Sequence, residues 1–160
     1  MLMKDNFSNF GELGIGSRLN RLSGQIMRET QEVYDAIKIN FDPYLFPIFK
    51  LIIDVGEITT THIQESLEYT QPAITQSVRK LKKMGYVSSK SDGMDGRKKI
   101  IYLTSEGKAI HERLVPVWEV IDVEVKLLTQ IKTNSLVEAL QKVELSLEEK
   151  SLSKRILEKL

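Results

Sequence analysis

The chain switches from a helical hydrophobic period to a strand period at one glycine, Gly85. Before Gly85, apolar residues recur at steps of four and three, as on one face of an α-helix. After it, two short runs of β-branched and aromatic residues, Tyr86–Lys90 and Lys99–Leu103, enclose a segment with two Asp-Gly pairs. Asp and Gly tolerate the positive φ of tight turns, so this segment predicts a β-hairpin. A helix that runs directly into a hairpin leaves few folds open to the chain.

Another short helix is predicted just before the helix that ends at Gly85. Its range is Ile58–Leu67, with N-caps available among Thr59 to Thr61. Three polar residues, 68–70, separate it from the helix 71–84, which carries Pro72 in its first turn. Two short helices joined by a three-residue turn are the pattern of a helix-turn-helix.

Longer helices are predicted toward both ends. An apolar stripe runs from Ile15 to Ile37, and Asp42-Pro43 then redirects the chain into a central apolar helix through 45–53. Thr104 is expected to cap a helix that continues to about Lys132 and bends at Pro116. A last stripe covers 136–147, and Ser146 with Glu149 resembles a capping box that begins a short terminal helix.

Length and composition favour one globular domain. The chain has 160 residues and no cysteine, which excludes disulfides and thiolate metal sites. No basic-then-apolar leader opens it, and its most apolar stretch, Leu45–Val55, is too short to span a bilayer. We therefore expect a soluble, cytoplasmic protein with no membrane contact. The fold class expected is mainly α with a small β-hairpin wing.

The net charge of +1 conceals a basic segment. Residues 71–99 hold eight basic and two acidic side chains, whereas the rest of the chain is net acidic. Such a segment suits a polyanion, although a solvated lysine-rich face is an equally ordinary interpretation.

The helix 71–84 has an outer face suited to reading DNA. With Ile74, Val78 and Leu81 buried, its polar side chains point away from the core or lie at its flanks. An α-helix fits the major groove, where Gln pairs with adenine and Arg with guanine. The alternative is an amphipathic helix whose outer face meets only water. The candidate DNA contacts are Gln71, Thr75, Gln76, Arg79, Lys80 and Lys83.

The hairpin tip supplies a second cationic group. An Arg at a protruding tip can enter the minor groove, where A·T-rich stretches concentrate negative potential. Asp95 is placed to hold the Arg97 guanidinium by a charge-assisted hydrogen bond. The candidate wing contacts are Asp95, Arg97, Lys98 and Lys99.

Three motifs in this order resemble the MarR family of winged-helix regulators. They are Gln71-Pro72-Ala73-Ile74-Thr75-Gln76 with Leu81-Lys82-Lys83-Met84-Gly85-Tyr86-Val87, then Asp95-Gly96-Arg97-Lys98, then Leu103-Thr104-Ser105-Glu106-Gly107-Lys108-Ala109. The resemblance spans roughly 12–150. It implies a recognition helix at 71–84, a wing at 95–98, and a long dimerisation helix that begins at Thr104.

The resemblance implies one MarR-like domain over 1–160, with dimerisation helices at about 12–40 and 104–160 and a DNA-binding lobe at about 43–103. It also implies an effector site with aromatic walls. The candidate lining residues are Tyr34, Phe46, Phe49 and Trp118, with Phe41 beside them, although ordinary core packing explains the same residues. The run Glu12–Leu19 is similar to MarR domains fused ahead of an acetyltransferase. The chain stops where that second domain is expected to begin, so we expect no acetyltransferase activity.

The function expected is a homodimeric repressor that binds double-stranded DNA at an inverted repeat, with a small aromatic effector as a further partner. One helix and one wing bind too weakly alone, and the terminal stripes need a partner surface. No metal-ligand spacing, phosphate-binding loop or catalytic constellation occurs, so neither an enzyme nor a cofactor is expected. The alternative is a winged-helix protein-interaction module that does not read DNA.

Overall fold

The computed structural model describes residues 7–93, 99–131 and 134–160. These residues fall into two compact units, Met1–Leu114 and Val115–Leu160, whose boundary lies within one helix. The expected single domain over 1–160, with its dimerisation and DNA-binding parts, stays a prediction. No helix in the described ranges is long and apolar enough to cross a bilayer.

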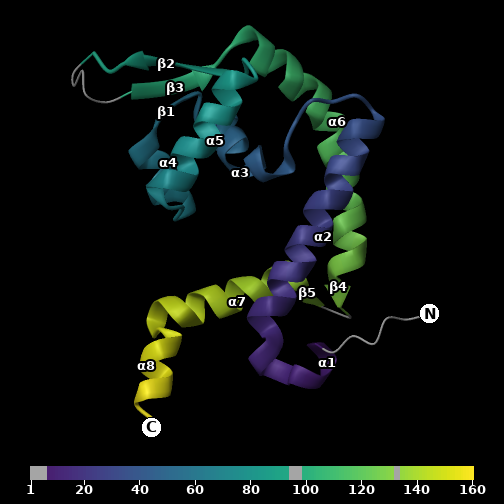
Figure 1. Cartoon of the computed structure of the whole chain (residues 1–160), viewed down its shortest axis with the longest axis vertical. Helices are drawn as coiled ribbons and strands as arrows, with labels where there is room; N and C mark the ends of the chain where they lie inside the picture. Colours follow the sequence, from purple (N-terminus) through teal and green to yellow (C-terminus); the bar gives the residue numbers. More distant parts are fainter. Residues whose placement is uncertain (1–6, 94–98, 132–133) are drawn as a thin grey trace. The chain divides into compact units, whose positions relative to one another are not determined.

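The first unit opens with a short helix and a longer amphipathic one (Figure 1). The helix expected from Ile15 to Ile37 is confirmed as α2, and it ends where Lys38 adopts a left-handed conformation with φ 55°. The N–H of Ile39 donates to the carbonyl of Tyr34 across this end, at 2.8 Å. The leading elements are α1 (Phe7–Phe10), the 3-10 helix η1 (Gly11–Gly14), α2 (Ile15–Ala36), the 3-10 helix η2 (Pro43–Leu45) and α3 (Phe46–Val55).

The middle of this unit is a winged helix-turn-helix. The two short helices are α4 and α5, and a three-stranded antiparallel sheet of order β1-β3-β2 stands beside them (Figure 1). The predicted helix-turn-helix and hairpin are both present. The elements are β1 (Glu57–Thr59), α4 (Thr60–Leu67), α5 (Gln71–Lys83), β2 (Val87–Ser91) and β3 (Lys99–Leu103), followed by the start of α6 (Ser105–Thr129).

The strand β1 was not predicted. Ile58, expected at the start of a helix, instead lies in this strand and pairs with Ile101 of β3. The helix begins two residues later, and its N-cap is Thr59, whose hydroxyl accepts from the N–H of His62 at 3.2 Å. The extended conformation of Ile58 is set by a partner more than forty residues away, which local spacing does not report.

An aromatic cluster forms much of the core of the first unit. The ring of Phe41 lies 5.9 Å from Tyr34 in an edge-on contact, 5.2 Å from Phe49 and 6.5 Å from Tyr86. Edge-on and offset contacts of this kind add to the gain from burying the rings. The central helix α3 contributes Ile48, Phe49 and Ile52, all of them fully buried, as the sequence predicted.

The second unit holds the rest of α6, a two-stranded ribbon and two helices. The long helix ends at Thr129 and not near Lys132, because the chain there turns into a short strand that pairs with Asn134 and Ser135. The elements after α6 are β4 (Gln130–Ile131), β5 (Asn134–Ser135), α7 (Leu136–Glu149) and α8 (Leu152–Leu157).

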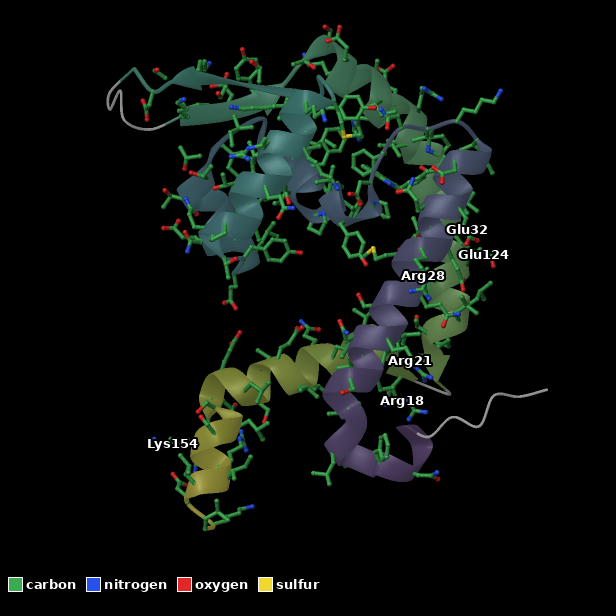
Figure 2. The ribbon with its side chains drawn as sticks, in the orientation of Figure 1. Arg18, Arg21, Arg28, Glu32, Glu124 and Lys154 are labelled. Atoms are coloured by element: carbon green, nitrogen blue, oxygen red, sulfur yellow. The ribbon has the colours of Figure 1, made fainter. Side chains whose placement is uncertain are left out.

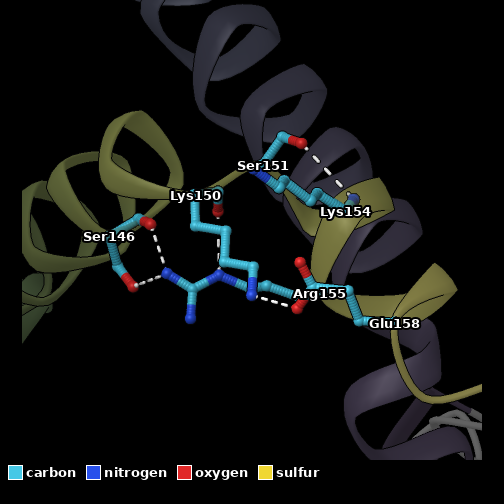
Figure 3. A network of polar contacts seen from close by, with 6 residues as sticks. All are labelled: Ser146, Lys150, Ser151, Lys154, Arg155 and Glu158. Carbon is cyan, nitrogen blue, oxygen red and sulfur yellow. Dashed lines mark hydrogen bonds and ion pairs between the residues drawn. The ribbon is translucent and has the colours of Figure 1, made fainter.

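The capping box expected at Ser146 and Glu149 is not one. Ser146 lies inside α7, and the capping box begins that helix at Ser135, whose hydroxyl accepts from the N–H of Glu138 at 3.1 Å. The terminal helix α8 starts from Ser151. The guanidinium of Arg155 closes the end of α7 by donating to the carbonyl and hydroxyl of Ser146 (Figure 3). The guanidinium is thus an additional donor to the Ser146 carbonyl, which also accepts from the N–H of Lys150, at the helix end where a cation is favourable.

Candidate nucleic-acid interface

The turn between α4 and α5 depends on one left-handed residue. Glu68 has φ 53°, and its N–H donates to the carbonyl of Gln64 at 2.9 Å, which ends α4. The next helix starts from Thr70, whose carbonyl accepts from the N–H of Ile74 at 3.1 Å. Thr70 occupies the predicted N-cap position, but its hydroxyl makes no capping bond. The two helices are therefore set at a fixed angle by backbone geometry.

The second helix of the motif, α5, is fixed along its inner face and at its end. Ile74, Val78 and Leu81 are buried, as the helical period predicted. At the end, Gly85 takes φ 78°, and the N–H of Tyr86 donates to the carbonyl of Leu81 at 3.0 Å. This pattern is a Schellman motif, in which a left-handed glycine lets the orphan carbonyls find donors.

The six predicted contact residues of α5 are all exposed. Gln76, Arg79 and Lys83 make no side-chain hydrogen bond or ion pair within the described part of the chain. Thr75 donates its hydroxyl to the carbonyl of Gln71 at 2.9 Å and keeps lone pairs for a ligand. Lys80 differs from these residues, because its ammonium pairs with the carboxylate of Asp42.

The wing strands pair in a regular register. Val87 faces Leu103, and Ser91 faces Lys99 at the far end of the ladder, where Lys99 is exposed. The predicted tip contacts Asp95, Arg97 and Lys98 lie outside the described residues. Lys90 lies on the outer strand beside Glu57, with 2.6 Å between its ammonium and the carboxylate.

A close backbone contact joins the wing to the long helix. Thr104 caps α6, since its hydroxyl accepts from the N–H of Gly107 at 3.0 Å and donates to the carbonyl of Gly85. Gly107 lies so near the carbonyl of Tyr86 that a Cβ would stand 2.0 Å from that oxygen. Only glycine fits there, which explains the Gly107 of the third motif. Beside this joint, hydrogen bonds from its own backbone N–H and from Ser105 lower the pKa of the Glu106 carboxyl.

Tyr86 connects the end of the helix-turn-helix to the loop after α2. Its hydroxyl donates to the carbonyl of Asn40 at 2.6 Å, and its ring packs against Phe41 and Phe49. Burial raises the pKa of this phenol, and the nearby Arg113 cation lowers it by a smaller amount.

The aromatic residues expected to line an effector site lie in different settings. Tyr34 and Phe49 are buried in the core of the first unit, while Phe46 is 39% exposed. Trp118 is half-buried in the second unit. An effector site built from these residues stays a prediction.

Two residues of the site were not singled out in the sequence. Asp42 was noted only as a chain redirection before Pro43, and Lys82 only as part of a motif. Their roles depend on partners far along the chain or across a turn: Lys80 for Asp42, and Ser89 for Lys82. No periodic pattern reports such pairings.

The fold and the exposed face of α5 define a winged helix-turn-helix protein. Residues 46–98 match the model of the MarR family. A curated relative, the HTH-type transcriptional regulator PapX of Escherichia coli, is 30% identical over 94 residues. That alignment spans 59% of this chain and 57% of PapX. These findings confirm the resemblance to the MarR family.

Solved structures agree with this fold. A mutant MarR of Escherichia coli in complex with operator DNA superposes with a TM-score of 0.70 at 18% identity, covering 86% of this chain and 97% of that one. A structure concerned with regulation of DNA binding of Bordetella bronchiseptica BpsR by 6-hydroxynicotinic acid gives 0.63 at 19% identity, covering 84% and 91%. At these identities the likeness concerns the fold.

Proposed function

We propose that the protein is a homodimeric, sequence-specific regulator that binds double-stranded DNA and represses transcription. The observation that carries the proposal is the outer face of α5, on which Gln76, Arg79 and Lys83 are exposed with no internal partner in the described chain. The helix presents an amide, a guanidinium and an ammonium from a backbone that is fixed at both ends. These groups have the chemistry that reads base edges and phosphates in a major groove.

The wing completes the proposed interface. We assign the minor groove to the tip, with Arg97 entering it, Asp95 holding the guanidinium, and Lys98 and Lys99 near phosphates. The regular pairing of β2 with β3, which ends at Ser91 and Lys99, supports this assignment.

The proposal of a dimer is supported by apolar side chains that are exposed in the single chain. Val115–Leu160 contains no fully buried residue among those described, and its helices expose many large apolar side chains. A surface of that extent is typical of protein interfaces. A second copy related by a two-fold axis would supply a second recognition helix, and two half-sites in successive major grooves are about 34 Å apart, one turn of DNA.

An aromatic effector is the remaining part of the proposal. The BpsR structure concerns regulation of DNA binding of that protein by 6-hydroxynicotinic acid. By analogy, binding of a flat aromatic acid would favour one spacing of the two recognition helices over another.

The test is a selection of bound duplexes from a random pool. We expect the winning sequences to contain an inverted repeat with half-sites one helical turn apart. Gln76→Ala or Arg79→Ala should relax the preference at particular bases by about 1–3 kcal/mol. Lys159→Ala, which removes a charge near the end of the chain, is the matched control and should leave base preference unchanged. Bound duplexes without a shared sequence would refute specific reading, and no bound duplex at low salt would refute DNA binding.

A further inference from the structure

The basic side chains of α5 fall into two groups by their contacts. Lys80 pairs with Asp42, and the Lys82 ammonium donates to the Ser89 hydroxyl at 2.6 Å. Arg79 and Lys83 make no such contact in the described chain. Neighbouring cations of α5 therefore differ: two of them have a partner within the protein, and two have none in the described chain.

The two bonded lysines leave the helix on opposite flanks. With about 100° per residue, Lys80 lies about 120° to one side of the buried Ile74, and Lys82 lies about 80° to the other. Arg79 and Lys83 lie between them on the outer face, about 140° and 180° from Ile74. A bond on each flank opposes rotation of α5 about its own axis in either direction.

The anchor on the first flank is itself held in place. The other carboxylate oxygen of Asp42 accepts from the backbone N–H of Tyr44 at 3.0 Å, which caps η2. The preceding loop is bonded by Tyr86 to the Asn40 carbonyl, and by Arg113 to the Lys38 carbonyl at 3.2 Å. Asp42 is thus a fixed acceptor for Lys80, with only 23% of its side chain exposed.

The anchor on the second flank belongs to the sheet. Ser89 lies in the middle of β2, where it faces Ile101 of β3. A bond from Lys82 to this strand fixes the angle between the recognition helix and the wing.

We infer that Lys80 and Lys82 are positioning residues that set the rotation of α5, and that they are not phosphate contacts. This inference rests on the proposed function and revises the expectation that Lys80 touches DNA. Arg79 and Lys83 then supply the charge that meets the groove, while the two bonded lysines set the direction in which the outer face points.

The salt dependence of DNA binding separates the two roles. Each phosphate contact contributes about 0.9 to the slope of log K against log salt concentration. Lys83→Gln should lower the slope by about one, whereas Lys80→Gln and Lys82→Gln should leave it unchanged. The latter two should instead weaken binding to the selected duplex by about twofold to fivefold, the range that an exposed ion pair supports.

Asp42→Asn provides the decisive comparison. If Asp42 holds Lys80 in place, this variant should weaken specific binding as Lys80→Gln does, and the double variant should be no worse than either single one. If Lys80 contacts phosphate and Asp42 only competes for it, Asp42→Asn should strengthen binding. That result, or a slope lowered by Lys80→Gln, would overturn the assignment of Lys80, and a slope lowered by Lys82→Gln would overturn that of Lys82.

Hydrogen exchange of the free protein provides a readout without DNA. We expect Asp42→Asn, Lys80→Gln and Lys82→Gln to speed exchange of the α5 amides, and Lys83→Gln to leave it unchanged. Exchange that is unchanged in the first three variants would refute the positioning role even if the protein binds DNA as proposed. Faster exchange in a protein that binds no duplex would refute only the proposed function.

Discussion

Among the glycines that the structure describes, Gly107 has the least space for a side chain. The carbonyl of Tyr86 lies where its Cβ would be, and the side chain of Leu103 lies 3.2 Å from the same point. The obstacle is backbone, which cannot rotate away as a long side chain can. The first turn of α6 and the end of the helix-turn-helix are packed together because this position has no side chain.

Gly107→Ala should lower the free energy of unfolding by about 1–3 kcal/mol, the usual cost of overpacking a tight site. Gly16→Ala is the matched control, because a Cβ at Gly16 in α2 meets nothing within 4 Å. That variant should be neutral or slightly stabilising. Denaturant titrations of both variants measure the difference, and equal midpoints would contradict the close contact.

Ionisation of Tyr86 is expected to lower the free energy of unfolding in alkali. Burial raises the pKa of its phenol above the ordinary value of 10.0, so the folded state favours the neutral form. This contribution is complete below pH 10 and is lost as the pH rises above 10 toward the folded pKa. Tyr86→Phe should remove that part of the pH dependence and cost about 0.5–1.5 kcal/mol at neutral pH, since the bond to Asn40 disappears. Tyr44→Phe, at a more exposed ring, should do neither in the same unfolding measurements.

At the scale of elements, the turn of the helix-turn-helix carries a strained residue. A non-glycine residue in the left-handed region costs roughly 1–2 kcal/mol, and Glu68 occupies that region with φ 53°. Glu68→Gly should therefore raise the free energy of unfolding by up to about 1 kcal/mol. Glu65→Gly, three residues earlier inside α4, should lower it by about 1 kcal/mol. Thermal unfolding that shifts in the same direction for both variants would contradict the assigned turn.

Elements with local signals were predictable from the sequence, and those set by distant partners were not. The inner face of α5 and its stop at Gly85 follow from spacing and from glycine's backbone freedom. The strand β1 escaped prediction because its conformation comes from pairing with β3. The pattern Ser-x-x-Glu occurs at both Ser135 and Ser146, and only the first follows an extended segment that lets it act as a cap.

In the candidate site, too, the exposed residues were predictable and the distant pairings were not. A helical wheel places Gln76, Arg79 and Lys83 on the outer face, and all three are exposed. The wheel places Lys80 at a flank but does not identify its partner, Asp42, 38 residues earlier. A contact between residues so far apart in the sequence depends on the whole fold. Only the structure therefore separates a cation that is available to DNA from one that is paired within the protein.

For the whole molecule, the distribution of apolar side chains predicts association. The apolar stripe of α2 stays partly exposed, with Leu22 at 40%. The same helix also carries charged side chains, including Arg18, Arg21, Arg28 and Glu32 (Figure 2). An amphipathic helix of this length with its apolar stripe in water requires a partner surface.

Light scattering at micromolar concentration should give particles of twice the 18.3 kDa chain mass. Leu22→Glu, which places a charge on the stripe, should shift the population toward single chains. Asn20→Glu lies on the opposite side of α2 and serves as the control, with the two-chain mass retained. Particles of single-chain mass for the unmodified protein would exclude the proposed dimer.

The joint between the wing and α6 has a mechanical consequence. Because Thr104 and Gly107 bind the hairpin base to the first turn of α6, the two rotate together, and displacement grows with distance along the strands. A strand of five residues such as β3 extends about 17 Å. A tilt of about 10° then moves its far end by about 3 Å, roughly the length of one hydrogen bond. A small tilt at the joint is thus amplified into the gain or loss of a contact at the far end of the hairpin.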